Sequence, residues 1–162
     1  MKDELKNKLS GVFAERQKRE AAAAKATEVR QSKEDEFLQA FMKATDDIIF
    51  PAMEEIGVMM RANGYQYSID RTSETLGHRA SIRLNILTDV DRSNHNQTFP
   101  FFEVYCNKGD QKFQFMESTI VPNRGGHRGG CGEATLETLT FDLLQQKITK
   151  TINDIVLGGG AS

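Results

Sequence analysis

The stretch His78–Thr88, HRASIRLNILT, decides the predicted fold of this 162-residue chain. Its apolar and polar side chains alternate. The apolar set on one face is Ala80, Ile82, Leu84 and Ile86, and the polar set on the other is Arg79, Ser81, Arg83 and Asn85. One buried face and one wet face are typical of a strand in an antiparallel sheet. We therefore expect a sheet that is covered on one side only.

Three further segments extend this sheet. Alternating residues at 65–69 indicate a strand before the opening stretch, and Phe99–Cys106 and Lys112–Ser118 indicate two strands after it. The last two flank the turn Asn107–Asp110, in which glycine can take a positive φ. The sequence thus predicts a four-stranded antiparallel β-meander.

Two amphipathic helices are expected to cover one face of the sheet, the face with Ile82, Leu84, Phe113 and Phe115. The first, at 37–62, has the apolar stripe Phe37, Phe41, Ile48, Ala52, Ile56 and Met60. Pro51 should kink or restart it, Asp47 could cap the restarted part, and Asn63-Gly64 should end it. The second follows Leu136, Leu139, Leu143, Leu144, Ile148, Ile152, Ile155 and Val156. This order of elements predicts an α+β fold with a long N-terminal helix.

Residues 1–36 form a predicted helical arm, polar and rich in alanine, in front of an α+β domain at 37–157 and a tail at 158–162. Leu5, Leu9 and Val12 follow the 4,3 spacing of a coiled-coil core. The next two positions of the same spacing are Arg16 and Arg19, so the apolar core does not continue. The arm is therefore either an exposed helix or an interface for oligomerisation or partner docking.

Composition narrows the possible partners. The formal net charge is −2, and no dense basic region supplies the phosphate-neutralising surface that non-specific nucleic-acid binding needs. No apolar run approaches the ~20 residues that span a bilayer. With no apolar leader, the two cysteines are expected to be free thiols in the cytoplasm. We expect a homo-oligomer or a protein partner, with no membrane and with nucleic acid disfavoured.

The glycine-rich segment 123–135, NRGGHRGGCGEAT, is the first candidate ligand site. It precedes a predicted helix, and Arg124, His127 and Arg128 could bind an anion while glycines expose backbone N–H groups. The spacing matches neither the Walker loop nor the dinucleotide fingerprint. The alternative is a mobile strand-to-helix connection.

The wet sheet face is the second candidate site. Arg79 and Arg83 are expected to point the same way, with Phe101 and Tyr105 flanking them on the next strand. Basic side chains beside aromatic rings can hold a single strand of nucleic acid or another anion. The alternative is a solvated face whose charges keep the protein in solution.

Catalytic and metal-binding patterns are weak. His127 and Cys131 are four residues apart, but the four-ligand spacing of a structural zinc site is missing. Cys131, near the start of a predicted helix, would have a lowered pKa, yet no motif supplies its base. The sequence therefore predicts no catalytic residue, metal or cofactor. It favours a non-enzymatic interaction or assembly protein with Leu5, Leu9, Val12, Phe101 and Tyr105 at interfaces, and the alternative is an anion-binding protein, possibly an enzyme.

Overall fold

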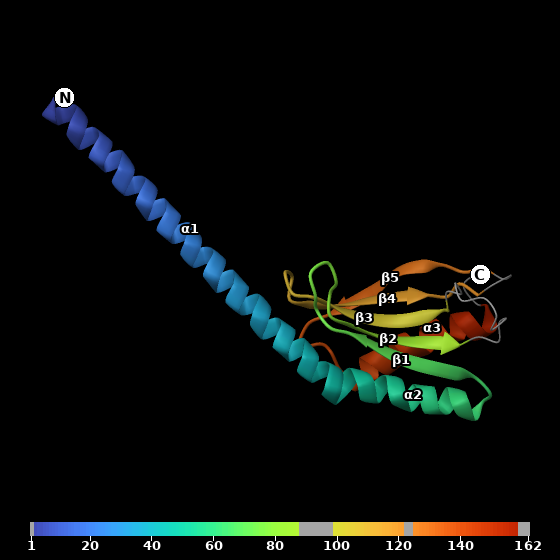
Figure 1. The fold of residues 1–162 in the computed structure, drawn as a ribbon. Coiled ribbons are helices and arrows are strands. Elements are labelled where there is room, and N and C mark those ends of the chain that lie inside the picture. Colours follow the sequence, from blue (N-terminus) through green and yellow to red (C-terminus); the bar gives the residue numbers. More distant parts are fainter. Residues whose placement is uncertain (1, 88–98, 122–124, 159–162) are drawn as a thin grey trace. The chain divides into compact units, whose positions relative to one another are not determined.

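The computed structural model of the chain describes residues 2–87, 99–121 and 125–158 (Figure 1). The helical elements are α1 (Asp3–Ala44), a π-helical turn η1 (Thr45–Ile49), α2 (Phe50–Ala62) and α3 (Phe141–Leu157). The strands are β1 (Gln66–Thr72), β2 (Ser81–Leu87), β3 (Phe101–Asn107), β4 (Lys112–Ser118) and β5 (Arg128–Ala134). In the described part of the chain, no helix is both long and apolar enough to cross a bilayer.

The chain divides into two compact units, Met1–Glu36 and Phe37–Ser162. The second unit is α+β, with helices and an antiparallel sheet as the sequence predicts. The sheet has five strands in the order β1-β2-β3-β4-β5, not the expected four. The added strand, β5, is the glycine-rich segment, so the expectation of a glycine-rich loop before a helix was wrong there.

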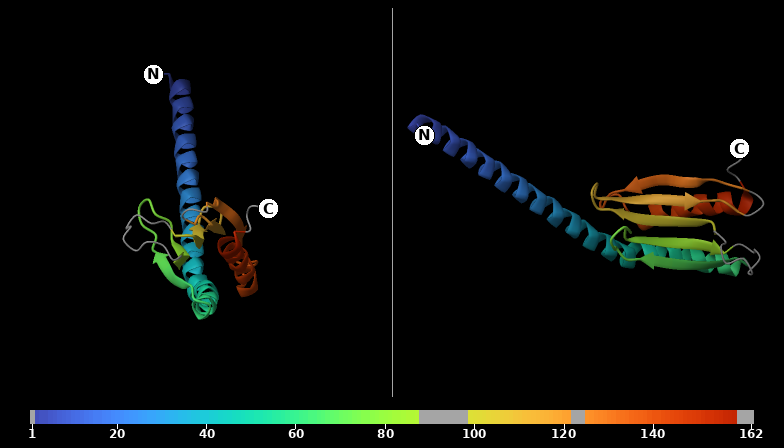
Figure 2. Two further views of the ribbon diagram at one scale, coloured as in Figure 1. Left: turned by 90° about the vertical axis from the view of Figure 1, so that its right-hand side faces the viewer. Right: turned by 45° about the horizontal axis from the view of Figure 1, so that its top comes forward.

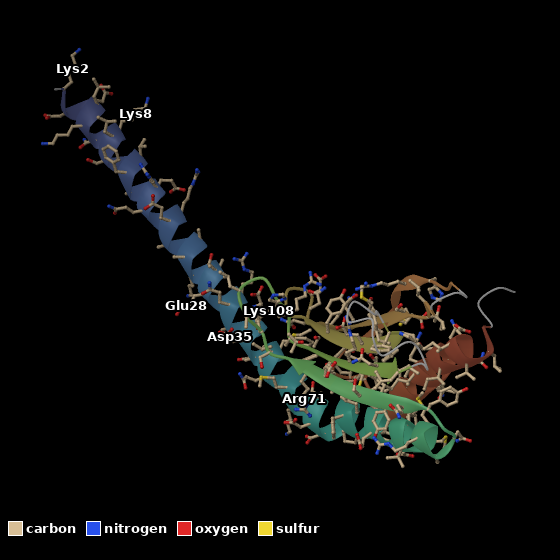
Figure 3. All side chains as sticks on the ribbon, turned by 45° about the vertical axis from the view of Figure 1, so that its right-hand side comes forward. Lys2, Lys8, Glu28, Asp35, Arg71 and Lys108 are labelled. Carbon is tan, nitrogen blue, oxygen red and sulfur yellow. The ribbon has the colours of Figure 1, made fainter. Side chains whose placement is uncertain are left out.

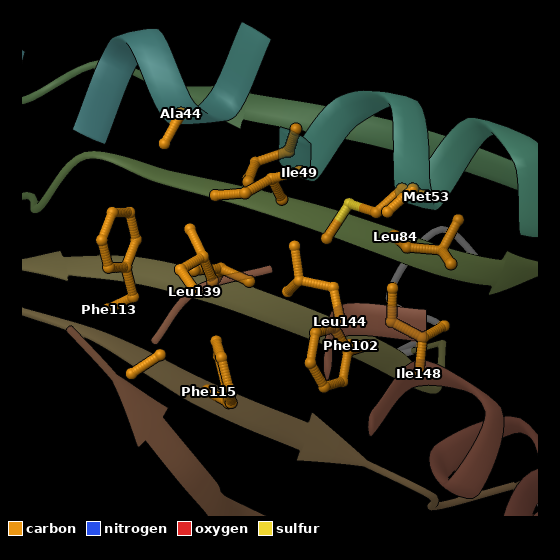
Figure 4. Close-up of a cluster of buried hydrophobic side chains, with 14 of the residues drawn as sticks. Ala44, Ile49, Met53, Leu84, Phe102, Phe113, Phe115, Leu139, Leu144 and Ile148 are labelled. Atoms are coloured by element: carbon orange, nitrogen blue, oxygen red, sulfur yellow. The ribbon is translucent and has the colours of Figure 1, made fainter. Parts of the chain in front are cut away.

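The core lies between the sheet and two helices. α2 and α3 cover the same face of the sheet (Figure 2). That face carries the four predicted core residues Ile82, Leu84, Phe113 and Phe115, all buried. The Phe113 ring contacts those of Phe37 and Phe41, with centroids 5.4 Å apart in both pairs. Figure 4 shows Leu84 of β2 and Phe102 of β3 in one cluster with Leu144 and Ile148 of α3.

The helix at 37–62 is interrupted before Pro51, as predicted, since the π-helical turn η1 ends at Ile49 and α2 begins at Phe50. The chain stays helical through the π-helical turn η1, and no side chain caps α2, so the expected Asp47 cap is absent. Pro51 lies in the first turn of α2, where its missing N–H does little harm. As predicted, α2 ends at Asn63 and Gly64, the latter with φ of 90°.

The C-terminal helix begins later than its apolar stripe suggests. Thr140 caps α3 by accepting a hydrogen bond from the Leu143 N–H at 3.1 Å. Leu136 lies before the helix and is exposed, whereas Leu139 is buried although it too precedes α3. Gly158 ends the helix in the left-handed conformation, and the rest of the tail lies outside the described residues.

Candidate functional site

The sheet face opposite the helices, here called the outer face, brings together residues from four strands. Three rows of cross-strand neighbours define it: Ser81, Tyr105, Gln114 and Glu133; then Arg83, Glu103 and Met116; then Asn85, Phe101, Ser118 and Arg128. Arg79 adjoins the first row. The outer face therefore carries four of the residues that the sequence places in a site or interface on the sheet, and Arg128 as well.

Phe101 lies between two arginines from opposite sides of β3. The guanidinium carbon of Arg83, in β2, is 3.7 Å from the ring centroid, and that of Arg128, in β5, is 5.3 Å from it. Each distance is within the range of a cation–π interaction. The ring is 0% exposed, so Phe101 is not available to stack on a ligand as the chain stands.

Tyr105 and Arg79 form a second such pair, 5.1 Å apart from centroid to guanidinium carbon. Arg83 also pairs with Glu103 at 3.2 Å. In contrast, no carboxylate among the described residues lies within ion-pair distance of Arg79 or Arg128, and both side chains are exposed. These two cations remain accessible to an anion from solution.

The two described side chains of the predicted glycine-rich site have different partners, because Arg128 lies against Phe101 whereas His127 pairs with Glu117. Arg124 lies outside the described residues. His127 is in the described chain, but its imidazole Nε2 lies 2.8 Å from Glu117 Oε1, and its Nδ1 lies 3.1 Å from Thr119 Oγ1. The helix N-terminus that was expected to assist them starts seven residues after β5 ends. The expected cradle of loop, arginines and helix end is therefore not formed by the described residues.

Glu117 and His127 instead connect β4, the β4–β5 hairpin and α3. Glu117 is buried, and Thr151 of α3 donates its hydroxyl to Glu117 Oε2. Hydroxyl, imidazole and carboxylate thus lie in sequence, as in sites that activate a nucleophile. The Thr119 side chain is buried, however, so its hydroxyl is closed to a substrate. We assign this network a structural role, which the sequence did not reveal because Glu117 lies 34 residues from Thr151.

Neither cysteine is an activated nucleophile. Burial raises the pKa of the Cys131 thiol to about 11, with the nearby Glu117 carboxylate adding to the shift. The expected lowering of this pKa was wrong because Cys131 lies in β5, away from a helix start. Burial likewise raises the pKa of Cys106 to about 11. Among the described residues, no three His, Cys, Asp or Glu side chains are grouped to hold a metal ion.

The arm carries an apolar cluster near its N-terminal end. Leu5, Leu9, Val12 and Phe13 are 54%, 44%, 57% and 58% exposed, respectively. Sequence reasoning selected the first three by their spacing but missed Phe13, which the regular heptad register leaves out. We call these four residues the apolar tip.

Comparisons of the chain with family models, with curated proteins and with solved structures gave no match. Its function must therefore be inferred from its own residues.

Proposed function

We propose that this protein assembles with copies of itself through its helical arm. The supporting observation is the apolar tip, because four large apolar side chains on three turns of helix stand about half exposed. A helix in water is stabilised mainly by burying such a face against another element. Among residues 2–36 no side chain is buried within the chain, so the apolar surface is left for a partner.

The charges along the arm favour a second arm in antiparallel orientation. Residues 2–19 carry six Lys or Arg and three Asp or Glu, whereas residues 20–36 carry three Lys or Arg and five Asp or Glu. In Figure 3, Lys2 and Lys8 lie near one end of α1, and Glu28 and Asp35 lie farther along it. Antiparallel pairing sets the basic half of each arm beside the acidic half of the other, whereas parallel pairing sets like charges together.

Antiparallel pairing also brings apolar residues to the same level. When two arms spanning residues 2–36 overlap fully, Leu9 is level with Val29 of the second copy, and Val12 with its Ala26. Val29 is itself exposed. The run Ala21–Ala24 lies near the middle of the overlap, where small side chains allow the helix axes to approach closely.

Replacing the apolar tip with glutamine is expected to reduce the mass of the assembly by half or more. Glutamine keeps helix propensity and net charge but removes the apolar surface. Sedimentation equilibrium measures the mass, and circular dichroism checks that the helix persists. Leu76→Gln is the control, because Leu76 is fully exposed and lies outside the arm. An unchanged mass for the tip variant would refute the arm proposal.

Spin labels test the orientation of the arms. An Asn7→Cys label, in a chain with Cys106 and Cys131 replaced, should lie ~36 Å from its copy in an antiparallel pair, since a helix rises 1.5 Å per residue. A parallel pair would hold the labels about 10 Å apart. The short distance would overturn the antiparallel arrangement while leaving assembly through the arm intact.

A second candidate function is the binding of a phosphate- or carboxylate-bearing anion at the outer face. It is favoured by the accessible guanidinium groups of Arg79 and Arg128, which no described carboxylate neutralises. Arginine binds such anions through paired N–H donors. The ligand would lie at these two guanidinium groups, beside the partly buried Tyr105 ring.

Inorganic phosphate, a nucleotide and a polyanion are expected to raise the melting temperature if this second function holds. A ligand 100-fold above its dissociation constant adds about 2.7 kcal/mol to the free energy of unfolding. Arg128→Ala should abolish the rise, whereas Arg19→Ala, on the arm, should keep it. A rise that survives in Arg128→Ala would exclude the outer face as the binding site.

A further inference from the structure

β5 forms one edge of the sheet. Among the described strands it pairs with β4 alone, and Figure 1 shows it as the outermost strand. Arg128, Gly130, Gly132 and Glu133 are exposed along it. An edge strand offers unpaired backbone donors and acceptors to another strand, and natural sheets usually block it with lysine, proline or covering elements. β5 contains neither lysine nor proline.

The hydrogen-bond pattern shows which backbone groups of β5 face outward. The Thr119 N–H donates to the His127 carbonyl at 2.8 Å, and the His127 N–H donates to the Thr119 hydroxyl at 3.0 Å, so the backbone groups of these two residues face each other. In an antiparallel ladder the bonded pairs recur every second residue. Gly129 therefore bonds to Glu117, while the N–H and C=O groups of Arg128 and Gly130 point away from β4.

Gly129 and Gly130 on this edge have no steric explanation among the described residues, in contrast to Gly132. Gly132 has φ of 134°, and an added Cβ there would lie 3.1 Å from Lys147 Nζ. At Gly129 an added Cβ would meet nothing within 4 Å, and at Gly130 it would meet only the Phe115 carbonyl oxygen, at 3.8 Å. Neither residue has the positive φ that favours glycine. Glycine weakens a strand, and within strands it often marks the close approach of another backbone.

We propose that β5 of one copy pairs edge to edge and antiparallel with β5 of a second copy, joining two sheets into one. This contact is separate from the arm and goes beyond the function proposed above. The two-fold axis would pass between Gly130 and Cys131, next to the irregularity where β5 shifts register against β4.

Charge complementarity selects a second copy in this register. With the axis at that point, Arg128 lies opposite Glu133 of the second copy, and Gly129 lies opposite its Gly132. Arg128 and Glu133 are both on the outer face, as directly opposed residues must be. Lys112 and Gln114 each donate to Glu133 at 2.9 Å, which keeps this carboxylate charged and near the edge. The junction would thus contain two equivalent Arg–Glu pairs.

Gly130→Pro tests the edge contact in the full-length chain. Proline removes an outward N–H and none of the bonds to β4, so the fold should tolerate it as edge strands do. We expect the mass to halve, with the Asn7 spin-label distance unchanged. Combined with the glutamine substitutions in the apolar tip, it should give an 18.2 kDa monomer. If Gly130→Pro keeps the wild-type mass, the edge contact is overturned, whereas the arm proposal is unaffected.

Charge exchange tests the partner and the register. Arg128→Glu should weaken the assembly at least tenfold, because two glutamates then face each other. Adding Glu133→Arg should restore it. The antiparallel contact between two copies would be overturned if the double variant has wild-type thermal stability but does not regain wild-type association. The variants could lose the contact by unfolding, so hydrogen exchange is also measured on the wild-type protein. If β5 pairs with a second copy, the amide protection of residues 128–134 rises with protein concentration. Protection that does not depend on concentration would overturn the proposal.

Discussion

Replacing Phe113 with alanine is expected to lower the free energy of unfolding by about 3–5 kcal/mol. Phe113 is completely buried, and its ring packs against those of Phe37 and Phe41, so truncation leaves a cavity between the sheet and the C-terminal end of α1. In a chain of this size each 1 kcal/mol shifts the melting temperature by about 2–4 °C. Thermal and urea denaturation should therefore show a fall of roughly 6–20 °C.

Leu76→Ala is the matched truncation at the surface. Leu76 is fully exposed, so its loss should change stability by less than about 0.5 kcal/mol. Equal effects of the two substitutions would show that Phe113 is not in the core.

Replacing Gly57 with alanine should destabilise the protein although alanine is the better helix former. A Cβ at residue 57 would lie 2.3 Å from Tyr67 Cε2, closer than non-bonded atoms approach. The Tyr67 ring is held by a 3.0 Å hydrogen bond from its hydroxyl to Glu54 and by the Arg61 guanidinium over its face at 4.7 Å. Overpacking costs about 1–3 kcal/mol, against a helix-propensity gain of about 1 kcal/mol. We expect a net loss of up to about 2 kcal/mol in chemical denaturation.

Gly11→Ala makes the same change in a helix where nothing lies within 4 Å of the added carbon. It should leave the melting temperature unchanged or raise it, and increase the helical circular dichroism signal. A stabilising Gly57→Ala would mean that Tyr67 does not pack on α2.

The sheet was largely predictable from alternation. Lys112–Ser118 is β4 as expected, and β2 and β3 lie inside or next to their predicted ranges. The fifth strand was not predictable in this way, because RGGCGEA has hardly any apolar side chains to alternate. Its place is set by backbone pairing with β4 rather than by a buried face of its own.

The helix at 37–62 shows how far helical periodicity predicts burial. The stripe predicted Ile48 and Ile56 in the core, with Ile49 and Met53 at its margin. Ile49 and Met53 are completely buried, as is Ala52, whereas Ile48 and Ile56 pack against the core but are only partly buried. The π-helical turn η1 lies between Phe41 and α2 and favours Ile49 over Ile48 as the more deeply buried isoleucine. Nothing in the local sequence announces this turn.

The candidate site on the outer face was partly predictable from the alternation of apolar and polar residues along the strands. Alternation placed Arg79 and Arg83 on the wet face beside Phe101 and Tyr105, and the structure brings these four together. Arg128 joins them only because β5 is a strand, so its contact with Phe101 depends on a pairing 27 residues along the chain that no local pattern encodes.

The turn at Thr45–Ile49 also bears on how this chain can change in length. A π-helical turn holds one residue more than an α-helical turn, so it takes up an insertion within a single turn. Without it, one added residue would swing Phe37 and Phe41 about 100° around the helix axis and out of the core. We therefore expect that removal of one residue from Thr45–Ile49 converts this turn into an α-helical one and leaves Phe37 and Phe41 in the core.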